Sequence, residues 1–482
     1  MKTALQLTLI LVLLTIIGFA QKSPNDFVFT IKTDNPGVTN DSAYQLRLDV
    51  GVNYNVDIDW DNDGSFDTLG VNSTINHQYS STGSYTMRLR GTFPSIYLGS
   101  TINNFNTDAK KLVSVDQWGD QVWTFMDQMF LACDSLVALP TDTPNLSQVT
   151  TMNFMFKFSS SFQKGVAHWD VSNVTSMISM FDGAFQFNDS IGSWDVSNVS
   201  DMRYMFKAAT SFNQPLNAWD VSNVTNMERM FLGATAFNQS LNAWDVSNVT
   251  NMEGMFNYAI NFNESLNNWD VSSVIDMNGM FERAWSFNQP LYQWDVSNVS
   301  EMRRVFYHAS SFNQPLTNWS FASFNTNNIY NLSQFLSNSG LSTSNYDSLL
   351  IHWYTNYPSL NANVGAHTLE FCQASAQRDS LIASGWTFLG DTLDSNCQLV
   401  GLEEDMVKQS KFLIYPIPSS DYVTILAENL NGERLRIFNT QGQLVKELQL
   451  NTKQTSLDVR ELPNGIYFMQ GKGISEKLVV QH

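Results

Sequence analysis

The chain has few of the residues that most enzymes use for chemistry. Its 482 residues include three cysteines and six histidines, and the histidines are scattered without metal-site spacing such as HxxxH. No P-loop, GxGxxG or GxSxG context occurs. Paired carboxylates for glycoside hydrolysis stay open, because they come from distant positions. The sequence therefore predicts no catalytic residues, and a protein that is not an enzyme.

Positive charge is scarce as well. The chain has 26 lysines and arginines against 45 acidic residues, a formal net charge of -19 at pH 7. Nucleic acid and anionic membrane surfaces repel such a chain, so neither is an expected partner. The apolar fraction of 43% is ample for packed cores, and the length predicts about three domains.

Long apolar runs are absent except at the N-terminus. Residues 1–20 contain Lys2, an apolar run from Leu5 to Ile17, and the small residues Gly18 and Ala20, the layout of a secretory signal peptide. The run is too short to span a bilayer comfortably, and no later segment approaches about 20 apolar residues. An uncleaved anchor is the alternative. We expect an exported protein that is not an integral membrane protein.

What the chain has in abundance is a repeat of 25 residues. Self-similarity at this period marks a solenoid, in which each unit must stack on its neighbours to bury its apolar face. The array extends over about residues 116–340. Its evenly spaced tryptophans are Trp169, Trp194, Trp219, Trp244, Trp269, Trp294 and Trp319.

One unit, residues 216–240, shows two apolar patterns. The MxxMFxxA pattern of residues 227–234 places apolar side chains at i, i+3, i+4 and i+7, which predicts a two-turn helix. Thr225 and Glu228 have the spacing of a capping box for it. Upstream, LxxWxVxxV in residues 216–224 predicts a very short strand. The expected fold class is an α+β repeat solenoid, leucine-rich-repeat-like, with coils of short strand plus short helix, flanked by small all-β sandwich domains.

The repeat is also familiar as a motif. FNQPLNAWDVSNVTNMERMF, residues 212–231, closely resembles the repeat of the BspA-like leucine-rich-repeat surface proteins of bacteria. The resemblance covers about residues 116–340. It implies an extracellular adhesion or protein-binding surface and names no ligand, since many members have none defined.

The repeated WDVS motif raises a question of charge. If WDVS is the strand, its Asp and Ser point outward, and stacking places them in ladders about 4.8 Å apart. Either each Asp accepts hydrogen bonds from the following turn, or the row binds cations or a polymer with a matching repeat. Both explanations stay open. The aspartates are Asp170, Asp195, Asp220, Asp245, Asp270 and Asp295.

Recognition of one particular partner requires residues that differ between coils. The two residues between the paired methionines change from coil to coil, and we expect them to face solvent on the helical side. The ligand-surface candidates are Arg203, Tyr204, Glu228, Arg229, Arg303 and Arg304, together with Asp220, Asp245 and Asp270 of the uniform row.

Residues 21–115 predict a different, small all-β domain. VDIDWDNDGSFD followed by YSSTGSYTMRL resembles PKD-type, immunoglobulin-like domains. Its acidic stretch has the spacing that opens a calcium loop, although Gly70 stands where the bidentate Glu belongs. A hairpin turn and a weak calcium site are therefore both open, and calcium is the one cofactor suggested. The candidate metal ligands are Asp59, Asp61, Asp63 and Asp67.

Residues 341–400 predict a C-terminal cap with two helical patterns that seals the last coil. Cys372 and Cys397 lie within it, and in an oxidising compartment a disulfide between them would contribute roughly 3 kcal/mol. Cys133 stands where later coils have Ala, so we interpret it as a small buried core residue.

Residues 405–482 predict a further small β domain. The strings IYPIPSSDYVTI, LRIFNTQGQLVKEL and LPNGIYFMQGKG resemble the C-terminal sorting domain of the type IX (Por) secretion system. One departure is Ile417, where that family usually has Asn. The resemblance implies the type IX secretion machinery as a partner, removal of this domain, and a protein secreted or attached to the outer cell surface.

These features together predict an exported surface protein whose solenoid is a non-catalytic adhesion or binding scaffold for an extracellular protein or glycan ligand. The alternative is a secreted carbohydrate-active enzyme or its polysaccharide-binding accessory module. A surface layer that self-assembles without a ligand is a third hypothesis.

Overall fold

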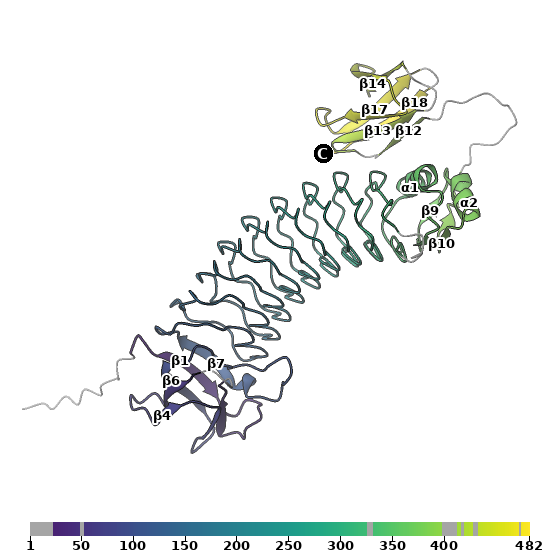
Figure 1. Cartoon of the computed structure of the whole chain (residues 1–482). Coiled ribbons are helices and arrows are strands. Elements are labelled where there is room, and N and C mark those ends of the chain that lie inside the picture. The colour runs from purple at the N-terminus through teal and green to yellow at the C-terminus, as the bar shows by residue number, and fades with distance from the viewer. Residues whose placement is uncertain are drawn as a thin grey trace, which may run out of the picture.

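The computed structural model describes residues 23–48, 53–324, 331–397, 412–415, 419–427, 432–471 and 474–482. Figure 1 shows a β domain, an arc of stacked coils that ends on two helices, and a second β domain. The expected signal peptide, residues 1–20, and Ile417 lie outside the described residues. None of the helices in the described ranges is long and apolar enough to cross a membrane.

The N-terminal domain is built from two antiparallel sheets. The larger has the order β4-β3-β6-β1-β7, and the smaller pairs β2 with β5. The strands are β1 (Phe27–Lys32), β2 (Ala43–Leu46), β3 (Asn55–Asp59), β4 (Thr68–Val71), β5 (Ile75–Gln78), β6 (Ser84–Thr92) and β7 (Leu112–Gln117), with a 3-10 turn at Ala109–Lys111.

This domain shares its hydrophobic core with the array. One continuous cluster of buried side chains extends from Phe27 to Trp386. At the junction, the ring of Phe27 lies 5.7 Å from Trp118 and 5.3 Å from Trp123, centroid to centroid. The expected boundary at residue 115 falls inside β7. The N-terminal domain therefore seals the first coil.

The coils themselves contain neither the expected helix nor the expected strand. Between residues 124 and 324, all described, the backbone forms only turns, bends and isolated bridges. The parallel bridges join Ser176 to Asp201 and so on from coil to coil, where we expected the start of the helix. The α+β description of the coil is therefore wrong.

Hydrogen bonds of residues 177–184 explain this difference. The N–H groups of Met177, Ser179 and Phe181 donate to carbonyls of the next coil at 3.1, 2.8 and 2.9 Å. The N–H groups of Met180 and Asp182, which alternate with these, donate to the carbonyl three residues earlier in the same coil, both at 3.2 Å. Every second amide thus belongs to an inter-coil ladder. A helix would keep all of these amides within its own segment.

The alternation requires left-handed backbone twice in each coil. Ser179 has φ 54° and Gly183 has φ 74°, and the equivalent pair recurs along the array. Some coils place glycine there, as at Gly254 and Gly279, because glycine adopts this conformation without strain. Apolar side chains at i, i+3, i+4 and i+7 point inward in this ribbon as they would in a helix, so their pattern could not separate the two.

Columns of aromatic rings fill the array. Successive tryptophans from Trp194 to Trp319 stack with centroids 6.2–6.5 Å apart and planes within 7° of parallel. Two phenylalanine columns, which start at Phe156 and Phe162, have spacings of 5.5–5.8 and 5.6–6.1 Å. The expected Met and Phe core is confirmed, since these side chains are fully buried.

The FNQ loops form a second ladder, of side chains. The N–H of Asn213 and the side-chain amide of Gln214 both donate to Asn188 Oδ1, at 2.9 and 3.0 Å. The backbone bond of this pair recurs in each following coil. In the last one, Asn313 Oδ1 accepts the N–H of Ser342 at 2.8 Å. The loop ladder therefore ends on the cap.

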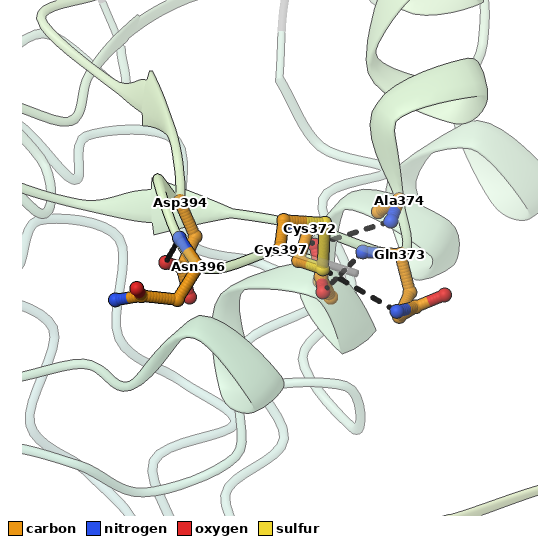
Figure 2. The surroundings of a disulfide bond; sticks show 7 residues. Cys372, Gln373, Ala374, Asp394, Asn396 and Cys397 are labelled. Carbon is orange, nitrogen blue, oxygen red and sulfur yellow. Dashed lines mark hydrogen bonds between the residues drawn. A yellow bond between two sulfur atoms is a disulfide. The ribbon is translucent and has the colours of Figure 1, made fainter. Parts of the chain in front are cut away.

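The cap contains the two expected helices. Figure 2 shows its disulfide between Cys372 and Cys397, the pair expected from the sequence. The Asp347 carboxylate accepts the N–H groups of Cys372 and Gln373 at 2.9 and 2.8 Å, which fixes the chain beside that bridge. The elements are α1 (Thr343–Asn356), β8 (Asn363–Gly365), β9 (Glu370–Phe371), α2 (Ser375–Ala383), β10 (Thr387–Leu389) and β11 (Thr392–Leu393).

The C-terminal domain has a hydrophobic core of its own, which includes Val423, Ile437 and Met469. Its sheets have the orders β12-β13-β16 and β15-β14-β17-β18. The strands are β12 (Phe412–Tyr415), β13 (Tyr422–Ala427), β14 (Glu433–Asn439), β15 (Leu444–Leu450), β16 (Gln454–Asp458), β17 (Gly465–Gly471) and β18 (Ile474–Val480).

A helix and a left-handed turn predict opposite effects for Gly254→Ala. In a helix, Ala is favoured over Gly by about 1 kcal/mol. At φ 59°, Ala is instead strained by about 1 kcal/mol. We expect urea unfolding to show a loss of about that size. Asn tolerates this conformation better, so Gly254→Asn should lose less, and a gain in stability for Gly254→Ala would contradict the turn.

Candidate binding faces of the array

The inter-coil ladder presents one continuous outer surface. We call it the ladder face and define it as the outward side chains of residues 151–158, 176–183, 201–208, 226–233, 251–258, 276–283 and 301–308. The methionines of these segments, and the phenylalanine that follows the second methionine position in each, point into the core. The remaining positions are the ones that differ between coils.

Charge is distributed unevenly between this face and the rest of the array. Within residues 124–324, the ladder face has seven basic and seven acidic residues, net zero, whereas the other positions have one basic and eleven acidic residues, net -10. The seven basic residues are Lys157, Arg203, Lys207, Arg229, Arg283, Arg303 and Arg304. The ladder face is therefore a mixed-charge surface on an otherwise acidic array.

Four of the sequence-predicted candidates lie close together on this face. The Tyr204 hydroxyl donates to Glu228, and Arg229 donates to that hydroxyl at 3.3 Å. Arg229 also forms an ion pair with Glu253 of the following coil. Arg203 pairs separately with Asp201 at 2.8 Å. Tyr204, Glu228 and Arg229 thus form, with Glu253, a network across three coils, and Arg203 lies beside it.

Arg303 and Arg304 lie on the same face but outside that network. The Arg304 side chain donates to Gln334 at 2.6 Å, and its guanidinium lies 5.7 Å from the ring centre of Tyr307. Arg303 is exposed. The six variable candidates therefore divide into two groups at different heights of the array.

Aromatic residues of this face were missed from the sequence. Lys157 lies 4.9 Å from the ring centre of Phe158, and Arg283 lies 4.8 Å from that of Tyr258. Phe158 and Tyr258 are 42% and 40% exposed, so these rings are accessible. For Tyr258 the signal was available, because Arg283 stands 25 residues later and so occupies the neighbouring position of the stack, whereas Lys157 and Phe158 are adjacent in the sequence.

Two carboxyl groups of the ladder face have perturbed acidity. Burial raises the pKa of Glu253, an effect that Arg229 opposes. Burial also raises the pKa of Asp276, and Glu301, its bridge partner, raises it further. Carboxyl groups with raised pKa values are the type used for acid catalysis, although structural networks also produce them.

The repeat aspartates lie on another surface and make local bonds. The N–H and hydroxyl of Ser222 donate to Asp220 Oδ1 at 3.0 and 2.6 Å, which lowers the pKa of Asp220. The same backbone bond occurs in every one of these turns, so the structure contains the hydrogen bonds of the first explanation. Its donors are Ser172, Ser197, Ser222, Ser247, Ser272 and Ser297.

The four candidate calcium ligands form the turn between β3 and β4. Carboxylate oxygens of Asp59, Asp61 and Asp67 lie within 4.8 Å of one another. Asp63 does not join them and accepts the N–H of Ser65 at 2.7 Å. Asp59 is already paired with buried Arg88 at 2.9 Å. The aspartates are therefore largely satisfied by the hairpin turn and by this arginine.

Comparison with known proteins identifies two regions. Residues 124–244 and 234–348 match a family described as Mycoplasma protein of unknown function, DUF285. Residues 413–481 match the secretion system C-terminal sorting domain of the Por type. The chain is exported by type IX secretion. Its sorting domain directs it to the outer cell surface or the medium, and its array is a DUF285 repeat region.

Beta-agarase A of Zobellia galactanivorans is 34% identical to this chain over 80 residues, which are 16% of this chain and 14% of the agarase. The chain thus matches only a small part of the length of this relative.

We predict that calcium has little effect on the N-terminal domain, because Arg88 already neutralises Asp59. Calorimetric titration of the full chain should show no saturable binding below about 1 mM, the range of extracellular calcium modules. Asp61→Asn serves as the matched variant. Saturable heat that this substitution abolishes would show that the cluster is a metal site.

We expect the triple substitution of Asn for Asp220, Asp245 and Asp270 to leave ligand and calcium binding unchanged. The Asn oxygen still accepts the serine N–H but lacks the charge. Because folding lowers the pKa of Asp220, its contribution is full above the unfolded value of about 3.9 and is lost as the pH falls through the folded value. The variant should therefore be less stable than wild type at pH 7, and this difference should disappear once the pH is low enough to protonate the carboxyl group of Asp220 in the folded protein. Weaker ligand binding at pH 7 would point to the cation row instead.

Proposed function

We propose that this protein is a non-catalytic binding protein of the cell surface, similar to the BspA-like leucine-rich-repeat proteins, and that its ladder face binds an extracellular protein or glycan. The array supplies a rigid support, and the side chains that vary between coils supply recognition. Functional residues placed on a rigid scaffold can be held in position without ordering a loop on binding.

The observation that carries this proposal is the segregation of variable residues. Seven of the eight basic residues between positions 124 and 324 are on the ladder face, beside accessible rings such as Phe158 and Tyr258. Binding surfaces are enriched in Arg and Tyr and depleted in other charged residues at their centres. The network of Tyr204, Glu228 and Arg229 holds such side chains in fixed positions.

The polarity of this face also limits the ligand. Its net charge of zero gives no general attraction for polyanions. Planar polar groups beside aromatic rings suit hydroxyl-rich or mixed-polarity ligands, that is, glycans and polar protein surfaces. This supports an adhesion or receptor role without selecting between the two ligand classes.

The alternative is a carbohydrate-active enzyme or its accessory module. It is favoured by the raised pKa values of Glu253 and Asp276 and by the short match to an agarase. Against it, Glu253 is held by Arg229, and most other acids of the ladder face are paired, such as Asp201 with Arg203. A general acid is normally left free to donate its proton to the substrate.

We predict that Tyr204→Gly/Arg229→Gly strongly weakens binding while the fold is kept. Both residues have positive φ, and Gly254 and Gly279 occupy the equivalent positions of later coils, so glycine fits there. Loss of two central contacts should weaken binding at least tenfold. The full chain and the variant would be compared on immobilised matrix proteins and polysaccharides, with circular dichroism as a check of folding.

Asp220→Asn is the control, because it lies on the other surface and should bind as wild type does. Equal binding by the glycine variant would exclude the ladder face. Polysaccharide turnover by wild type that Glu253→Gln or Asp276→Asn removes would establish the enzymatic alternative.

A further inference from the structure

We infer that the last coils of the array hold the sorting domain of the same chain, and that Tyr292 and Thr317 form the docking surface. Figure 1 shows this domain above the tips of the last coils, beside α1. The contact surface is the loop edge of the coils. It is separate from the ladder face, so the inference does not depend on the proposed function.

The repeat itself changes at the docking surface. The second residue of the LxxW motif is Asn in three successive coils, Asn217, Asn242 and Asn267. Each of these side chains accepts a backbone N–H of the next coil, at 3.2, 3.3 and 3.2 Å. The next two coils have Tyr292 and Thr317 at this position. The asparagine ladder therefore stops where the sorting domain begins to make contact.

Both replacements face the sorting domain. The Tyr292 hydroxyl donates to Asp421 Oδ2 at 2.8 Å, and its ring meets Tyr422 edge to face at 6.4 Å between centroids. Thr317 and Tyr415 line the same cleft between the array and the domain, and Tyr415 is only 6% exposed. Asparagine is too short to span the same gap as tyrosine. The two departures from the repeat thus coincide with the two positions that face the domain.

The contact is polar and leaves space for water. A cleft of about 860 Å³ lies between the array and the domain, lined by amide and hydroxyl side chains such as Gln289, Gln314 and Ser420. An interface with so few direct contacts is weak between separate molecules. The domain has a core of its own and is tethered to the array, so the contact forms within one molecule, at an effective concentration of about millimolar order.

The consequence is that the export signal is presented in a fixed orientation. Docking contacts the edge of the sorting domain at Asp421 and Tyr422 and faces Tyr415 across the cleft, while among the described residues no hydrogen bond, ion pair or ring contact joins the strands β15, β14 and β17 of its other sheet to the array. Because the interface is weak, a partner that binds the covered edge can displace the array. The array therefore acts as a reversible holder for its own sorting signal.

The test is small-angle X-ray scattering of the full chain. Tyr292→Asn/Thr317→Asn restores the repeat residue, so the array should fold as before while the domain detaches. We expect a larger maximum dimension and faster amide exchange in β12 and β13. Asn242→Tyr is the matched control, because it introduces the same side chain two coils away and should leave the scattering curve unchanged.

Asp421→Ala tests the contact from the other side and should have the same effect without any change in the array. Scattering curves identical to wild type for both the array variant and Asp421→Ala would overturn the inference. Tyr204→Gly/Arg229→Gly should not alter the scattering, so failure of docking and failure of ladder-face binding are distinguishable.

Discussion

The array depends on one constraint. In each ladder segment, every second backbone amide donates its hydrogen bond to a carbonyl of the next coil. Met177, Ser179 and Phe181 illustrate this pattern. A buried amide without an acceptor is costly, so a single coil has no stable conformation and the ends of the stack must be covered. The two ends are covered differently. At the start, Trp118 and Trp123 pack on Phe27. At the end, Asn313 Oδ1 accepts the N–H of Ser342 in the helical cap.

The same constraint makes the interior uniform and leaves the exterior free to vary. Amides that point along the stack must meet carbonyls at a fixed spacing, so core residues repeat as columns of Trp and Phe with nearly parallel rings. Side chains on the outer side of the ladder take no part in this register. They include most of the array's basic residues and the accessible rings of Phe158 and Tyr258. The DVSN turns, in contrast, are fixed by local bonds such as that from Ser222 to Asp220. Residues that differ between coils are therefore the best candidates for recognition of a specific ligand.

Much of this molecule could be predicted from its sequence, and the failures have a physical cause. The period, the buried Met and Phe positions, the cap helices and the Cys372–Cys397 disulfide all follow from apolar spacing and cysteine position. The prediction of a helix in each coil was wrong, because a ribbon of alternating right- and left-handed residues buries the same side-chain positions as a helix does. Gly254 and Gly279 inside the expected helix were the available warning. The networks of Tyr204 and of Tyr292 could not be predicted, since they join coils through side-chain orientation.

Departures from the repeat carry a measurable cost, and that cost helps to locate function. Tyr204 and Arg229 occupy left-handed positions where Gly254 and Gly279 show that glycine is accepted. A side chain there is strained by roughly 1 kcal/mol compared with glycine. The hydrogen bond and ion pair that these two residues form on the surface recover only part of this strain, because exposed pairs contribute about 0–1 kcal/mol. Stability alone would therefore favour glycine at both positions. In the proposed function, contacts with a ligand, which the isolated chain does not make, would offset the remaining strain at Tyr204 and Arg229.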